Sequence, residues 1–410
     1  MPRRTRPADR PGLDALLASK EMIVVCGSGG TGKTTVSAAL GAMAATRLGA
    51  RVLVLTVDPA RRLATALGLG ADALLDSAGV PGREVRVDPA LLAAGDPDAT
   101  GTNGAATGEL WVAMLDTKAG WDDLIRRHAP DEQLREQVLA NPLYQNITGR
   151  FVHSHDYLAM EKLHEVHASG RFDLVVIDTP PSRNALDLLD APSRMKEFFG
   201  SRLLRWLTVP YRSRLFTVAS KPFYQVADRV LGSRFLQDIA EFFVLFQTME
   251  HGFVARAEEV EQLLVDPRTS FVVVSTLEAA PAYEAGYLAR ELQRRGMNLG
   301  AVLLNRTLSP RLRAPAAATA ARALRSAVDD PAFVDRVAAA AEVSPSDVRA
   351  VLGEVGERFR DVAVVASREA ERRAELESLG ALTVAAPALG RDVSDVSSLL
   401  ELGRHLLDAR

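Results

Sequence analysis

Cysteine is nearly absent from this chain: 410 residues contain one, Cys26. A single cysteine cannot form an intrachain disulfide, and it cannot supply the ligands of an all-cysteine metal site. Such low cysteine content is typical of the reducing cytoplasm, so we expect a cytoplasmic protein. Cys26 ends a short apolar run, a position that predicts a small residue of the core.

Long hydrophobic runs and a strong net charge are also missing. No stretch reaches the about 18 uncharged apolar residues that a membrane span needs, so no direct membrane span is expected. Residues 1–10 carry four arginines, but no apolar stretch follows them, which argues against a signal peptide. The formal net charge of −3 argues against a dedicated nucleic-acid surface, and we expect no nucleic-acid partner.

The most informative segment that is present is a glycine-rich loop. Residues 23–35 read I-V-V-C-G-S-G-G-T-G-K-T-T, and the pattern G-x-x-x-x-G-K-[ST] is complete from Gly27 to Thr34. Glycines let the backbone approach a ligand, and the loop N–H groups and the following helix terminus then hold phosphates. Lys33 would pair with the β- and γ-phosphates, and the Thr34 hydroxyl would ligate Mg²⁺. The loop therefore predicts a nucleotide site.

Short runs rich in Val, Ile and Leu recur along the chain and predict strands. They lie at 22–26, 51–57, 172–178, 271–276, 300–305, 363–367 and 382–386. The runs are almost continuously apolar, as parallel strands are when helices cover both faces of a sheet. Helices are expected at 33–48 and 58–69. The fold class is therefore α/β: a doubly wound, mostly parallel sheet of the P-loop NTPase kind with helical insertions.

Two long intervals interrupt the alternation of strands and helices. The first contains helical patterns from Leu110 to His128, Glu132 to Leu139 and Asp156 to Ala168, and the second has almost no strand signal. Helices are also expected over 310–360 and from Val393 to Leu407. We expect residues 20–95, 170–190 and 268–410 to form the nucleotide-binding domain. Residues 96–169 and 191–267 are expected to form a helical subdomain at the carboxyl edge of the sheet.

Two aspartates follow predicted strands. Asp58 comes after strand 51–57, where a carboxylate could orient or deprotonate an attacking water. Asp58 precedes Pro59, so it could instead cap a helix, and both roles stay open. Asp173 to Asp178 reads D-L-V-V-I-D, a Walker B strand whose last carboxylate would hold a Mg²⁺-bound water. Asn305 ends a later strand without the Asp of a guanine-specific motif, and its amide could bond adenine, which favours ATP.

These segments resemble the arsenite-pump ATPase and tail-anchored-protein targeting ATPase family, a deviant Walker A branch of P-loop NTPases. The resemblance rests on the loop G-S-G-G-T-G-K-T-T, on T-V-D-P-A-R-R-L, on V-V-I-D-T-P-P-S-R-N-A-L-D-L-L and on L-L-N-R. It implies ATP and Mg²⁺ as cofactors, Asp58 in switch I, Asp178 at the start of switch II, and adenine contacts from Asn305 and the loop that contains Pro387. The implied phosphate ligands are Gly29, Gly30, Thr31, Gly32, Lys33, Thr34 and Thr35.

The chain departs from the pattern of that family at its cysteines and in its loop. Family members typically carry a lysine after the first loop glycine, and this lysine reaches a partner subunit's nucleotide; here the position is Ser28. The chain is thus identified as an actinobacterial-type member that lacks the loop lysine. With Cys26 alone, arsenite binding through thiolates is not expected, and no Cys-x-x-Cys pair exists to bridge a dimer through zinc.

The interpretation is a dimeric ATPase that converts ATP and water to ADP and phosphate and couples its nucleotide state to a partner's conformation. One alternative is a nucleotide-gated holdase for apolar helical clients, suggested by apolar residues within 190–265: Phe198, Phe199, Leu203, Leu204, Trp206, Phe242, Phe243, Leu245 and Phe246. The alternative explanation, which we favour, is that the same residues form the buried core of the helical subdomain. The other alternative is a weakly hydrolysing subunit of a heterodimer with a lysine-bearing paralogue.

Four histidines lie close together in the sequence, His153, His155, His164 and His167, and their side chains are candidate metal ligands. His164 and His167 are three residues apart on a predicted helix, a spacing that can share a metal. No further ligand obviously completes the set, so a solvated helix face is expected.

Overall fold

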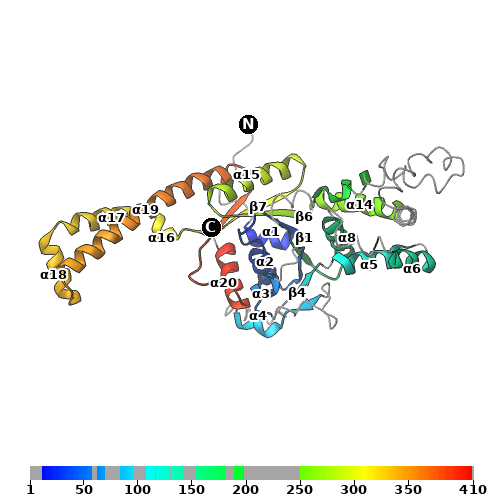
Figure 1. Cartoon of the computed structure of the whole chain (residues 1–410), viewed down its shortest axis with the longest axis horizontal. Coiled ribbons are helices and arrows are strands. Elements are labelled where there is room, and N and C mark those ends of the chain that lie inside the picture. Colours follow the sequence, from blue (N-terminus) through cyan, green and yellow to red (C-terminus); the bar gives the residue numbers. More distant parts are fainter. Residues whose placement is uncertain are drawn as a thin grey trace, which may run out of the picture.

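The computed structural model describes most of the chain. The described residues are 12–57, 62–69, 84–95, 108–115, 117–129, 131–141, 144, 154–180, 189–194, 196–197 and 250–408. They form one eight-stranded sheet in the order β3-β4-β2-β5-β1-β6-β7-β8 (Figure 1). Along the chain the strands are β1 (Met22–Cys26), β2 (Arg51–Thr56), β3 (Val85–Arg86), β4 (Glu109–Met114), β5 (Leu174–Asp178), β6 (Thr269–Ser275), β7 (Leu299–Thr307) and β8 (Leu382–Pro387).

The sheet is parallel except at one edge, where β3 pairs antiparallel with β4. A parallel sheet is usually buried on both faces, so alternate residues of one strand pack into different cores, as they do in β1. Met22, Val24 and Cys26 pack in one hydrophobic cluster, whereas Ile23 and Val25 pack in another. The expected doubly wound α/β class is therefore confirmed.

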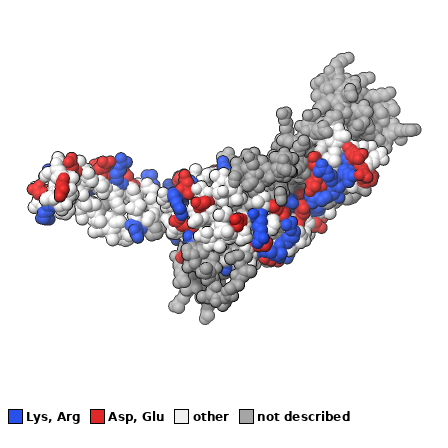
Figure 2. Space-filling view, turned by 90° about the horizontal axis from the view of Figure 1, so that it is seen from below, with Lys and Arg blue, Asp and Glu red and all other residues white. Residues whose placement is uncertain are grey.

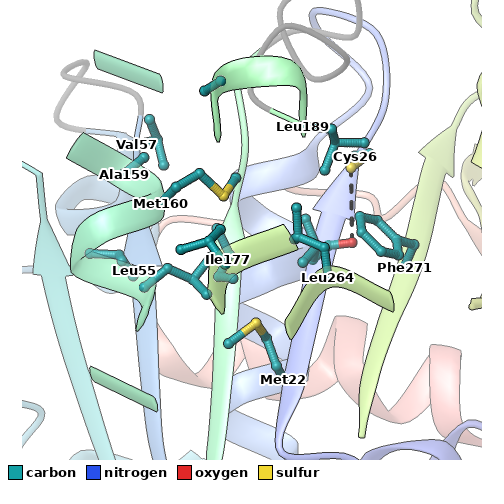
Figure 3. Close-up of a cluster of buried hydrophobic side chains, with 14 of the residues drawn as sticks. Met22, Cys26, Leu55, Val57, Ala159, Met160, Ile177, Leu189, Leu264 and Phe271 are labelled. Carbon is teal, nitrogen blue, oxygen red and sulfur yellow. Dashed lines mark hydrogen bonds between the residues drawn. The ribbon is translucent and has the colours of Figure 1, made fainter. Parts of the chain in front are cut away.

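Different helices cover the two faces. One face packs against α1 (Leu13–Ser19), α2 (Lys33–Leu48), α3 (Arg62–Ala66), α4 (Pro89–Gly95) and α20 (Val396–Leu407). The other face packs against α5 (Thr117–His128), α6 (Glu132–Ala140), α8 (Ser154–Ala168), α14 (Glu250–Val265) and α15 (Ala279–Arg294). Side chains from strands and helices meet in this second core (Figure 3): Met22, Cys26, Leu55, Ile177, Phe271, Met160 and Leu264.

A helical arm extends from the sheet between β7 and β8. It consists of α16 (Pro310–Arg313), α17 (Pro315–Val328), α18 (Pro331–Ala341) and α19 (Pro345–Glu377), in yellow and orange in Figure 1. Each of these helices begins with a proline. Proline suits the first helical position because the N–H that it lacks would have no hydrogen-bond partner within the helix there. A small separate cluster of Val334, Ala338 and Val348 packs α18 against α19.

Two secondary-structure predictions are wrong. Residues 110–114 were expected to begin a helix, but they form β4 because Leu110 and Val112 pair beside β2 and are buried there. Residues 363–367 were expected to be a strand, but they lie inside the 33-residue helix α19. Val364 and Val365 are 49% and 47% exposed, so this apolar run covers no sheet. Short apolar runs do not distinguish helix from strand, and tertiary packing decided both cases.

Charge is distributed without a dominant sign on the face shown in Figure 2. Basic and acidic side chains are interspersed over the arm and over the opposite end of the molecule. Many pair along the same helix, as Arg127 does with Asp123 and Arg373 with Glu377. Among the helices of the described residues, none combines the length and the apolar character that crossing a membrane requires.

Candidate nucleotide-binding site

The glycine-rich loop connects β1 to α2 and has the backbone that its glycines predict. Gly30 and Gly32 have φ angles of 80° and 89°, values that favour glycine. A Cβ on Gly27 would lie 2.1 Å from the carbonyl oxygen of Val274, so only glycine fits beside β6. Gly32 is the N-cap of α2 and has no side chain that could accept a hydrogen bond from the N–H groups of the first turn.

Lys33 is folded back over the loop. Its Nζ donates a hydrogen bond to the Ser28 carbonyl oxygen at 3.0 Å, and Thr31 Oγ1 donates to the same oxygen at 2.9 Å. Lys33 is only 8% exposed. The ammonium group is thus held inside the loop, close to the backbone that would surround a phosphate.

The Walker A and Walker B segments meet at Asp178. Thr34 Oγ1 donates to Asp178 Oδ2 at 2.6 Å, which brings together the two residues that the sequence assigned to Mg²⁺. Thr56 Oγ1 donates to the same carboxylate oxygen at 3.0 Å. The motifs did not single out Thr56. Its position could have indicated the contact: Thr56 is a polar residue at the end of an apolar strand, and this strand pairs with β5 so that Thr56 lies beside Asp178.

Asp58 lies outside the described residues, so its roles as base and as cap stay predictions. The neighbouring Val57 N–H donates to the Asp178 carbonyl oxygen at 3.1 Å. The segment before Asp58 therefore ends beside the Walker B strand. Residues 198–249, which hold the apolar side chains of the holdase hypothesis, also lie outside the described part of the chain.

A cavity of about 420 Å³ adjoins the loop, within the size range of small-molecule sites. Its walls come from the loop and α2, from the end of β7, and from the segment between β8 and α20. The lining residues are Gly32, Thr35, Asn305, Arg306, Pro387, Ala388, Leu389, Arg391, Asp392, Val393 and Leu402. The cavity therefore brings together Asn305 and Pro387, the two residues expected on the adenine side, next to two loop residues.

Asn305 uses its amide within the protein. Its Nδ2 donates to the Thr31 carbonyl oxygen at 2.9 Å, and its Oδ1 accepts from the Arg306 backbone N–H at 3.0 Å. Arg306 has a φ of 55°, a left-handed conformation that is uncommon outside glycine. Sequence reasoning missed the contact with the loop and the left-handed backbone of Arg306, because a motif reveals neither a tertiary contact nor a φ angle.

Cys26 lies directly before the loop and is fully buried. Burial raises the pKa of its thiol to about 12, because the charged thiolate loses its hydration. The thiol points into the core in Figure 3. It is a core residue, as the sequence predicted.

The two described histidine side chains of the cluster contact different glutamates. His164 Nε2 lies 3.2 Å from Glu259 on α14, and His167 Nε2 lies 2.9 Å from Glu21, which precedes β1. No group of three or more His, Cys, Asp or Glu side chains within the described ranges could hold a metal ion. His153 lies outside the described residues, and the structure does not describe the side chain of His155.

Comparison with known proteins decides the family. Residues 20–327 match the sequence model of the family described as anion-transporting ATPase. The chain belongs to this family. The resemblance drawn from the motifs is thereby confirmed, whereas α18 and α19 of the arm lie beyond the matched residues.

Individual relatives are distant. An uncharacterised protein of Streptomyces coelicolor is 31% identical over 46% of this chain and 40% of its own length. A putative arsenical pump-driving ATPase of Aquifex aeolicus is 23% identical over 70% of this chain and 63% of its own length. The ATPase GET3 of Komagataella phaffii is 24% identical over 71% of this chain and 74% of its own length. The match thus spans less than two thirds of the first two relatives.

Proposed function

We propose that this protein binds ATP and hydrolyses it to ADP and phosphate. The observation that carries the proposal is the contact of Thr34 with Asp178 beneath a complete phosphate loop. Two motifs 144 positions apart in the sequence share one hydrogen bond, as a nucleotide site of this family requires. The cavity beside the loop offers space for the base and ribose.

Thr34 and Asp178 would hold Mg²⁺. Hydroxyl and carboxylate oxygens are the hard ligands that this ion prefers, and their 2.6 Å separation shows that both reach one place. When bound, the ion neutralises charge on the phosphates. Thr56 donates a hydrogen bond to the same carboxylate oxygen of Asp178 as Thr34 does. These donors suit the ion, whereas Cys26 is buried and unsuited to a thiolate ligand.

The residues of the loop, together with Asp58, Asn305 and Pro387, would bind the nucleotide and the attacking water. Loop N–H groups and the terminus of α2 would bind the phosphate oxygens. Lys33 would exchange its bond to the Ser28 carbonyl for the β- and γ-phosphates, a stronger, charged acceptor. Asp58 would position the attacking water and accept its proton. Asn305 and Pro387 would contact the adenine.

We further propose a cytoplasmic dimer that transmits its nucleotide state to a partner. The family resemblance supports this assembly, because the lysine of the family acts across a dimer. Ser28 favours a second candidate, a slow ATPase that pairs with a lysine-bearing paralogue. Its side chain is neutral and the residue is only 7% exposed, so it supplies no cation to a neighbouring subunit.

Binding and turnover of variants test the ATPase proposal. Lys33→Ala removes the charge aimed at the phosphates and is expected to abolish measurable binding of Mg-ATP by calorimetry. Asp58→Asn is expected to leave binding intact and to slow phosphate release by about 100-fold or more, because general-base assistance is lost. Wild-type protein that neither binds ATP nor releases phosphate contradicts the proposal. Wild-type turnover by Asp58→Asn would leave Asp58 as a helix cap only.

A further inference from the structure

Asn305 ties the phosphate loop to the end of β7. Asn305 is 6% exposed, and its Nδ2 reaches the Thr31 carbonyl oxygen at 2.9 Å. A Cβ on Gly32 would lie 2.4 Å from the same nitrogen, so the amide is packed directly against the loop backbone. This contact joins residues 274 positions apart in the sequence.

The bond acts on a peptide that faces the phosphates. The Thr31 carbonyl and the Gly32 N–H belong to one planar trans peptide and point in opposite directions. Holding the carbonyl toward Asn305 therefore holds the Gly32 N–H toward the other side of the loop. Lys33, the next residue, begins α2. The direction of a phosphate-binding donor thus depends on a side chain from another strand.

Arg306 keeps the amide in the orientation that this contact needs. Its backbone N–H donates to Asn305 Oδ1 at 3.0 Å, so the oxygen faces Arg306 and the nitrogen faces the loop. Arg306 adopts its left-handed φ of 55° at this position. Strained backbone of this kind persists where the surrounding structure requires it, often at ligand sites.

The amide retains capacity for a ligand. An asparagine side chain carries two N–H donors and an oxygen with two lone pairs. One donor serves Thr31 and one lone pair serves Arg306, so one donor and one lone pair remain for a base. Contact with a base and support of the loop are therefore compatible in one side chain.

We infer that Asn305 is a positioning residue of the phosphate loop, in addition to any contact with the base. It would set the affinity for the polyphosphate part of the ligand through the Thr31–Gly32 peptide. The inference rests on the proposed nucleotide site and specifies how that site is assembled. This role can be distinguished from base recognition, because the affinity for a ligand that has no base should still depend on Asn305.

The test compares Mg-ATP with Mg-tripolyphosphate, which has the phosphates but no base. Calorimetry on the full chain would measure both affinities for wild type and for Asn305→Ala. We expect Asn305→Ala to weaken tripolyphosphate binding about tenfold, the effect of losing one hydrogen bond at the loop. Binding of ATP should fall by at least the same factor.

Two further variants complete the design. Asn305→Asp keeps the shape and the acceptor for Arg306 but places an acceptor against the Thr31 carbonyl, so it should weaken tripolyphosphate as well. It also carries the test if Asn305→Ala does not fold. The matched control is Leu389→Ala, in the segment after β8 that also lines the cavity; it should weaken ATP binding and leave tripolyphosphate affinity unchanged. Hydrogen exchange should rise at residues 28–34 in the Asn305 variants alone.

The outcomes separate this inference from the proposed function. Asn305 variants that weaken ATP but bind tripolyphosphate as wild type does would assign the residue to the base alone and overturn the inference. Wild-type protein that binds neither ligand would overturn the proposed nucleotide site and the inference with it. Parallel losses for both ligands, with Leu389→Ala affecting ATP only, would support the inference.

Discussion

Asp178 accepts hydrogen bonds from two threonines, and the motifs assign a role to only one of them, Thr34. Thr34 was predictable because its place in the glycine-rich pattern assigns it a role. Thr56 was not, because its contact depends on the register of β2 against β5, which pairs Thr56 with Asp178. Asn305 shows the same limit: its position at the end of a strand was predictable, but its bond to the loop was not.

Replacing Thr56 with valine tests the supporting bond. Thr56→Val keeps the side-chain shape but removes one of the two threonine donors to the Asp178 carboxylate. We expect phosphate release to slow by about tenfold, because a hydrogen bond to a charged group is lost. Thr46→Val is the control, since Thr46 bonds only within α2, to the Ala42 and Met43 carbonyls. Equal rates for the two variants would show that Thr56 does not assist Asp178.

Ser28 leads to a second prediction at the scale of one residue. A cation supplied in trans can contribute a factor of about 10³–10⁵ to phosphoryl transfer, and the serine hydroxyl carries no charge. Turnover should therefore be slow for the purified chain and rise in Ser28→Lys or on addition of a lysine-bearing paralogue. Steady-state phosphate release measures all three samples. If the wild type alone is as fast as the others, the missing lysine has no cost and the heterodimer hypothesis fails.

At the scale of elements, six of the eight strands were predictable, and β3 and β4 at one edge of the sheet were not. β1, β2 and β5 carry long apolar runs that are buried on both faces, so their sequence signal is strong. β4 is largely buried as well, but a helix follows its run E-L-W-V-A-M, and the run was assigned to that helix. The stretch 363–367 has the apolar character of a strand, yet its flanks are rich in helix-forming Arg, Glu and Ala.

The helical arm has a small hydrophobic cluster of its own, so a substitution in this cluster can test the stability of the arm separately. Val334 is fully buried between α18 and α19, whereas Val351 on α19 is 59% exposed. Val334→Asp would bury an unpaired charge at a cost of about 3 kcal/mol or more and should unfold the arm locally. Limited proteolysis should then cut within 315–345, while Val351→Asp stays resistant. Cleavage of both variants alike would show that this cluster does not hold the arm.

At the scale of the whole molecule, the residues that match the family model end before the last strand of the sheet. The matched residues end at 327, inside α17, but the chain returns through α19 to complete the sheet with β8. β8 supplies Pro387 to the cavity, so a segment beyond the match contributes to the candidate site. The topology could be inferred from the sequence only in part, because an apolar strand does not reveal its neighbour.

The arm packs against the rest of the molecule close to the candidate site. Glu369 of α19 is 9% exposed and accepts a hydrogen bond from the Leu308 backbone N–H at 3.1 Å. Leu308 lies three residues after Asn305. The long helix is therefore attached to the same segment that supports the phosphate loop.

The single buried thiol makes the chain well suited to chemical labelling. Burial raises the pKa of the Cys26 thiol far above pH 8, so the thiol stays protonated there, and the side chain is inaccessible. A chromogenic disulfide reagent should therefore find no reactive thiol in the native protein and one per chain in denaturant. Rapid reaction of the native protein would contradict this. Cysteines introduced on the arm and on α2 could then take spin or fluorescent probes without removing any native thiol.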